Sequence, residues 1–167
     1  LSITDSFDIY DGGALDAAFL GLGEVDEEGN VNVSKFGSRC TGPGGFINIT
    51  QNTGKVCFMG TFTAGHMDCK TGGGLLSIEK DAEYVKFKTF SSRYARENGQ
   101  EVLYITERAV FRLEAGGLTL TEIAPGIDIE KDILPKMEFV PLISPELKTM
   151  DERIFTDKKM KISFIDR

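Results

Sequence analysis

The chain has 167 residues, of which 41% are hydrophobic and 27% charged, and its 26 acidic and 19 basic residues give a formal net charge of -7. We expect one soluble domain, residues 1–167, because this length suffices to bury one core. The acidity excludes nucleic acid as a partner, since such surfaces are built from clustered Lys and Arg. No stretch approaches the roughly 18 consecutive apolar residues of a membrane span, and the start lacks a secretory signal, so we expect no membrane association and a cytoplasmic location.

The first part of the chain is dominated by strand-like patterns. Residues 6–16 alternate apolar and polar side chains and then reach two glycines, which predicts a short strand that enters a turn. Residues 15–37 contain two further strand-like runs, joined by the turn-forming sequence Asp-Glu-Glu-Gly-Asn. These two runs predict a hairpin.

A cluster of glycines precedes an amphipathic run and then a continuous apolar run. Gly42, Gly44 and Gly45 come directly before residues 46–53, for which we expect a short helix, and residues 55–62 are typical of a buried strand. A helix followed by a buried strand is characteristic of α/β proteins.

The second half contains several short β-rich runs separated by turn residues. The clearest hairpin turns at Gly116 and Gly117, and we expect an antiparallel part of the sheet over residues 101–123. Asp128 is the expected N-cap of a helix that ends at Pro135. For residues 145–167 we expect a short helix and a last strand. The predicted fold class is therefore α/β, an open and mostly parallel sheet covered by helices, with an antiparallel hairpin.

The glycine cluster has two interpretations. Glycines before a helix leave backbone N–H groups accessible, and such a place can bind an anion or stabilise a developing oxyanion. Equally, a glycine turn can simply let a strand pack against a helix. The sequence Thr-Gly-Pro-Gly-Gly matches neither the P-loop nor the dinucleotide-binding pattern.

Three long segments carry a family resemblance. Residues 7–37, 42–65 and 99–141 resemble the C-terminal part of the family I CoA-transferases, in particular single-chain acetate or propionate CoA-transferases of short-chain acyl-CoAs. The resemblance runs from about Asp5 to about Ile154. It implies the CoA-transferase fold, coenzyme A and acyl-CoA as substrates without a metal, and a homo-oligomeric enzyme.

The resemblance also implies a ping-pong mechanism through a glutamyl-CoA thioester. In this family the Gly-x-Gly-Gly segment supplies a backbone N–H to the oxyanion. Carried over to this chain, the resemblance assigns the donor to Gly45 and counts the adjacent Gly44 as catalytic with it. Gly42 and Gly44 allow the substrate to approach the backbone closely. The catalytic glutamate of the family precedes this segment and is expected upstream of Leu1. We therefore expect the chain to be an inactive fragment whose partner is the N-terminal part of the same enzyme.

Further residues are candidates for contact with CoA. Asp11, Gly12 and Gly13 resemble a turn beside the family's active site, or they form a simple turn. Lys35 could bind a CoA phosphate through its ammonium group, or it is a solvated lysine of a hairpin. Tyr10, Phe46 and Phe62 could line an acyl or pantetheine channel, or belong to the core.

Two other functions remain open. The chain could be a non-catalytic CoA-binding or assembly fragment, or a small hydrolase that uses Glu97 or His66. Glu97 lies in a Glu-Asn-Gly sequence, which has the wrong order relative to the glycine cluster and predicts a solvated turn. The odd count of three cysteines, without Cys-x-x-Cys spacing, indicates reduced thiols, and His66 with Cys69 lacks the further ligands of a zinc site.

Overall fold

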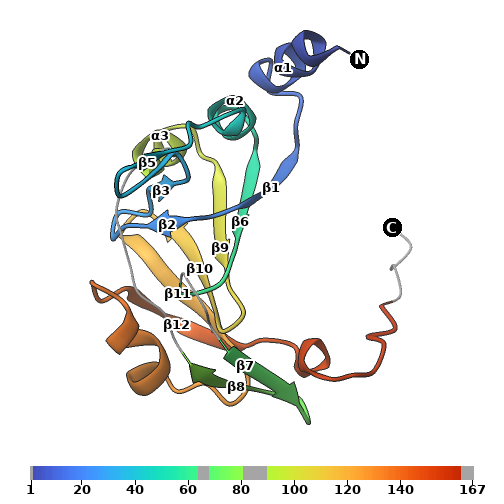
Figure 1. Cartoon of the computed structure of the whole chain (residues 1–167), viewed down its shortest axis with the longest axis vertical. Helices are drawn as coiled ribbons and strands as arrows, with labels where there is room; N and C mark the ends of the chain where they lie inside the picture. The colour runs from blue at the N-terminus through green and yellow to red at the C-terminus, as the bar shows by residue number, and fades with distance from the viewer. Residues whose placement is uncertain (1, 64–67, 81–89, 163–167) are drawn as a thin grey trace.

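A six-stranded sheet forms the centre of the computed structural model, which describes residues 2–63, 68–80 and 90–162 (Figure 1). The strands, in their order across the sheet, are β1 Ala17–Gly21, β6 Lys55–Met59, β9 Glu101–Ile105, β10 Ala109–Glu114, β11 Gly117–Ile123 and β12 Leu142–Thr149. The pairs β1–β6, β6–β9 and β11–β12 are parallel, whereas β9–β10 and β10–β11 are antiparallel. The predicted α/β sheet, mostly parallel with an antiparallel part at residues 101–123, is confirmed.

Short helices and two-stranded hairpins surround this sheet. The helices are α1 Ile3–Asp11, α2 Phe46–Gln51 and α3 Ser92–Glu97, and the helical turns are η1 Ile129–Ile133, η2 Leu134–Lys136 and η3 Glu152–Phe155. The hairpin strands are β2 Glu24–Val25, β3 Val31–Asn32, β4 Lys35–Phe36, β5 Arg39–Cys40, β7 Asp68–Gly72 and β8 Leu75–Lys80. Figure 1 shows α2 and α3 near the upper end of the sheet and the β7–β8 hairpin near its lower end. No helix in the described ranges is long and apolar enough to cross a membrane.

The N-terminal segment is a helix, so the strand predicted for residues 6–16 is wrong. Ser2 and Asp5 form a capping box, in which each side chain accepts a hydrogen bond from the other residue's N–H, at 3.1 and 2.9 Å. Hydrogen bonds with Ser2, first with its backbone N–H and then with its side chain, lower the pKa of the Asp5 carboxyl group. At the other end, the N–H of Gly12 donates to the carbonyl of Asp8. In this segment the hydrogen bonds that cap the helix thus determine the secondary structure, and the short alternation of apolar and polar side chains does not.

The hairpin predicted for residues 15–37 is smaller than expected. Its turn is confirmed, because the Asp26 carboxylate accepts the N–H groups of Glu28 and Asn30 between β2 and β3. The first of the two runs, however, forms β1 and pairs in parallel with β6. Because β1 lies next to β6, Ala18 is buried in the sheet. Pairing within a local hairpin would not bury this residue.

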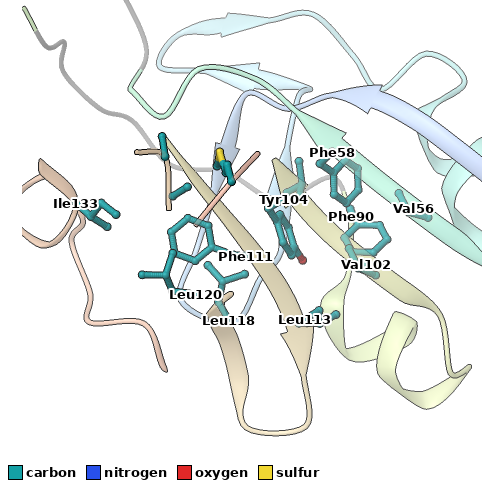
Figure 2. Close-up of a cluster of buried hydrophobic side chains, with 14 of the residues drawn as sticks. Val56, Phe58, Phe90, Val102, Tyr104, Phe111, Leu113, Leu118, Leu120 and Ile133 are labelled. Carbon is teal, nitrogen blue, oxygen red and sulfur yellow. The ribbon is translucent and has the colours of Figure 1, made fainter. Parts of the chain in front are cut away.

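The core lies on one side of the sheet (Figure 2). Phe58, at the middle of the predicted buried strand, is fully buried and packs against Phe90 and Tyr104 with ring centroids 4.9 and 5.6 Å apart. The hydroxyl of Tyr104 donates to the carbonyl of Gly29, and burial raises the pKa of this phenol well above its ordinary value. The hairpin β2–β3 is thereby held against the central strands.

The C-terminal third follows the sequence prediction in part. The Asp128 carboxylate caps η1 by accepting the N–H of Lys131, and Pro135 lies in the last helical turn, as predicted. In the tail, the short helical turn η3 follows the strand β12, and the expected last strand stays a prediction. Residues 163–167, and most of the β-rich run at residues 84–90, lie outside the described residues.

Candidate functional site

The glycine segment requires glycine at two positions for its backbone conformation. Gly42 and Gly44 have φ angles of +76° and +54°, which L side chains rarely adopt. Apart from the two chain neighbours, no atom of the described residues lies within 4 Å of a Cβ built at either glycine. Gly45 differs, because its φ of -82° is ordinary. A Cβ at Gly45 would lie 3.0 Å from Cζ of Phe7, so the ring of Phe7, on α1, approaches the backbone there.

The amide of Gly45 is available for an acceptor. It precedes α2, where the N–H of Phe46 donates to the carbonyl of Pro43 and the N–H of Ile49 donates to the carbonyl of Gly45. Within the described part of the chain, no acceptor is paired with the N–H of Gly45 itself. An oxyanion is the kind of group that such an amide, at the start of a helix, can bind.

The hairpin that carries Lys35 is joined to the glycine segment. The carbonyl of Ser34 accepts the N–H groups of Thr41 and Gly42, at 2.9 and 3.1 Å. The fully buried Asn32 donates through its amide to the carbonyl of Lys35 and to the carboxylate of Glu24, at 2.8 and 2.6 Å. The loop before Gly42 is therefore organised from within the chain, and Lys35 lies in it.

The residues at the end of α1 hold that helix against α2. The Asp11 carboxylate accepts the amide groups of Asn48 and Gln51, each at 3.0 Å, and the amide of Asn52 donates to the Asp11 carbonyl at 2.7 Å. Gly12 and Gly13 follow, and Gly13 has a φ of +74°. Asp11 therefore has a structural role at the junction, about one helical turn from Gly45.

The structure brings the predicted site residues to one region. Phe7 lies against Gly45, Asp11 contacts α2, and the Lys35 hairpin is bonded to Gly42. These contacts connect the segments of Asp11 and Lys35 to α2 or to the loop in front of it, whereas Phe62 lies elsewhere. Whether the residues bind CoA or take part in catalysis stays a prediction.

Sequence reasoning did not find a cavity of about 370 Å³ that lies beside the central sheet. It is lined by residues 22–28 around β2, by Thr61 and Phe62 after β6, by Thr106 after β9, and by residues 136–139. It thus lies at the carboxyl ends of parallel strands, where open α/β sheets commonly bind ligands. The glycine segment is not part of its lining. Strand order, which the sequence pattern does not give, is the signal that would have located it.

One wall of the cavity is fixed by a buried cation. Phe62 donates its N–H to the Glu107 carboxylate at 2.8 Å, and the Arg108 guanidinium lies 4.9 Å from the centroid of the Phe62 ring. Arg108 is fully buried and is paired with Glu107 at 2.6 Å. Phe62 lines this cavity and also packs against the buried core, so the structure fits both interpretations of it, whereas Phe46 is buried in the core.

The remaining candidates for chemistry have other environments. Glu97 is exposed and forms an ion pair with Arg93 at 2.9 Å on α3, while His66 lies outside the described residues. Burial raises the pKa of the Cys57 thiol, and Cys40 and Cys69 are exposed. Within the described ranges no group of three or more metal-ligating side chains occurs, and the absence of a metal stays an expectation.

Comparison of folds places the structure with acyl-CoA transferases. The crystal structures of acyl-CoA transferase YdiF from Escherichia coli O157:H7, as the apoenzyme and as a thioester complex with CoA, each superpose with a TM-score of 0.94 and 47% identity. Each match covers 100% of this chain and 34% of the YdiF chain.

Sequence comparison gives the same result. The caffeate CoA-transferase of Acetobacterium woodii is 53% identical in an alignment of 163 positions, and the match covers 91% of this chain and 31% of the relative. Acetate CoA-transferase subunit beta of Haemophilus influenzae is 31% identical over 146 residues, or 87% of this chain and 58% of the relative. No protein-family model matches the chain. The resemblance to the C-terminal part of a family I CoA-transferase is confirmed, and the chain spans only about a third of the single-chain relatives it matches.

Proposed function

We propose that this chain is part of an enzyme that moves CoA between short-chain carboxylic acids, and that it supplies the oxyanion donor and part of the CoA channel. The unpaired N–H of Gly45 at the start of α2 is the observation that carries the proposal. The similarity to proteins named as acetate and caffeate CoA-transferases supports the reaction class. Coenzyme A is the substrate that this class of reaction requires.

The reaction needs a carboxylate nucleophile, which we place in a part of the enzyme upstream of Leu1. One carboxylate oxygen attacks the thioester carbon, the C–S bond breaks, and CoA leaves as a thiolate, so that a mixed anhydride remains. The thiolate then attacks the enzyme's own carbonyl carbon and releases the first acid. A second carboxylate takes up CoA by the same two steps in reverse.

Each of these attacks places negative charge on a carbonyl oxygen. A backbone N–H that is fixed before the reaction stabilises this charge more in the transition state than in the bound substrate, which lowers the barrier. Gly42 and Gly44 add no side chains in front of Gly45, and the described residues leave open space where their Cβ atoms would lie. Lys35 would bind a CoA phosphate, and Asp11, Gly12 and Gly13 would form the nearby wall. A cytoplasmic homo-oligomer is the form in which we expect the enzyme to act.

Two substitutions at Gly45 distinguish the effect of losing the backbone N–H from the effect of adding a side chain. Gly45→Ala and Gly45→Pro both add a Cβ near Phe7, and the φ of Gly45, -82°, is close to that of proline, but only proline lacks the N–H. We expect kcat for CoA transfer in the whole native protein to be about 100-fold to 1,000-fold lower for Gly45→Pro than for Gly45→Ala. Melting temperatures of the two variants give the folding control. Equal kcat values in two folded variants would remove Gly45 as the donor.

A further inference from the structure

The central sheet has an apolar face that the described residues leave partly exposed. Side chains of successive residues in a strand point to opposite faces, and the buried core occupies one face of β6 and β9. The other face, here called the outer face, carries Phe19, Met59, Leu103, Ile105 and Val110, which the strand register places in adjacent rows. Phe19 and Met59 are 66% and 46% exposed, and the other three are half-buried. Cys57 lies on this face between Phe19 and Leu103 and is buried between them.

Charged side chains occupy one end of the outer face and pair with one another. Glu101 accepts Lys55 at 3.2 Å and Arg112 at 3.5 Å, and all three side chains are partly exposed. Because these charges already have partners on the same face, apolar contact is what the rest of the face offers to another molecule.

Such a face is unusual for this type of sheet. Parallel strands are nearly always covered on both faces, and a contiguous exposed apolar area on a soluble protein marks an interaction surface. The face includes β1, which lies at the edge of the sheet and, among the described strands, pairs with β6 alone. A partner at the outer face would therefore cover both the apolar rows and the strand at the sheet edge.

We propose that the outer face is covered by polypeptide from the part of the CoA-transferase that this chain does not contain. The chain matches only 31% of the caffeate CoA-transferase and 34% of the YdiF chain, so relatives of this size have ample further polypeptide for the purpose. This inference rests on the proposed function, because it assumes that the chain works within a longer CoA-transferase. It adds the surface at which the two parts of the enzyme meet.

Oxidation of methionine in the native wild-type protein tests the proposal without any substitution. Met59 is accessible in this chain, whereas Met150 is only 6% exposed and serves as the internal standard for a protected residue. Hydrogen peroxide oxidises accessible Met to the sulfoxide, and peptide mass spectrometry measures the rate at each site. We expect Met59 in the native protein to oxidise at least about tenfold more slowly than in urea, as Met150 does. If the oxidation rate of Met59 in the native protein is less than about tenfold below its rate in urea, the proposal is overturned.

Dilution distinguishes the proposed cover from a second copy of the protein. Protection that persists where the native protein has dissociated to monomers supports a cover within one polypeptide, and protection that disappears with dissociation assigns the face to a second copy and overturns the proposal. CoA transfer is measured on the same sample. An active enzyme with a rapidly oxidised Met59 would refute only the covered face, and an inactive protein with a protected Met59 would refute only the proposed function.

Discussion

At the scale of single residues, Gly44 and Gly37 form a natural pair. Their φ angles are +54° and +56°, and apart from the two chain neighbours no atom of the described residues lies within 4 Å of a Cβ built at either position. Gly44 belongs to the candidate site, whereas Gly37 lies in the turn between β4 and β5. A side chain therefore costs the same backbone strain at both positions and meets no neighbour at either.

Gly44→Ala and Gly37→Ala should each destabilise the native protein by about 1–2 kcal/mol, the cost of a left-handed conformation for an L-residue. Only Gly44→Ala should also slow CoA transfer, because its methyl group enters the approach to Gly45. Urea unfolding measures the first effect and initial rates measure the second. If both variants keep the wild-type rate, the approach to Gly45 does not pass Gly44.

The residues of the candidate site could be predicted from sequence more fully than their environment. The pattern of glycines before a helix indicated where the backbone would be accessible without side chains. The positive φ angles of Gly42 and Gly44 fit that expectation. The contact of Phe7 with Gly45 could not be predicted, because it depends on the helix α1. The alternation of apolar and polar residues over 6–16 had predicted a strand there. The structural use of Asp11 was hidden for the same reason.

At the scale of elements, the junction of α1 and α2 depends on a small set of polar contacts. None of the residues of α1 is buried, so little apolar packing holds this helix in place. Instead, Asp11 accepts hydrogen bonds from Asn48 and Gln51, and its carbonyl accepts one from Asn52. Since α1 carries Phe7 to Gly45, these bonds also position the glycine segment.

Asp11→Ala should loosen α1 while leaving the central sheet intact. Loss of exposed hydrogen bonds costs about 0.5–1.5 kcal/mol, which corresponds to amide exchange in α1 that is about two- to tenfold faster. Hydrogen–deuterium exchange with mass spectrometry measures this. Asp8→Ala is the control, since Asp8 is an exposed aspartate of the same helix. An equal effect of both variants would mean that the loss of an acidic side chain from the helix, and not the tie to α2, is responsible.

The elements themselves were predicted where local chemistry determines them. The helix at residues 46–51, the strand at 55–59 and the cap at Asp128 follow from periodicity and capping residues. The pairing of β1 with β6 could not be predicted in the same way, because it joins residues about forty positions apart through a parallel register. The cavity at the carboxyl ends of the strands depends on that same long-range order, and it stayed hidden in the sequence.

At the scale of the whole molecule, the chain has the sheet of a CoA-transferase and about a third of the length of its single-chain relatives. The proposed reaction requires a carboxylate nucleophile that the chain is not expected to supply. The polypeptide that carries these 167 residues in the cell should therefore have a mass well above 18.3 kDa, which intact-mass measurement of the native protein decides. A native mass of 18.3 kDa would contradict both the proposed function and the proposed cover of the outer face.

Glu97 provides the corresponding test of where the nucleophile lies. Its side chain is 59% exposed and is held by Arg93 on the surface of α3, an environment that neither excludes water nor raises the energy of the carboxylate. Glu97→Gln in the native protein should leave the rate of CoA transfer within about twofold of wild type, with Arg93→Gln as the control for loss of the ion pair. A loss of about 100-fold or more in Glu97→Gln alone would place the nucleophile within this chain, and the upstream glutamate would then be unnecessary.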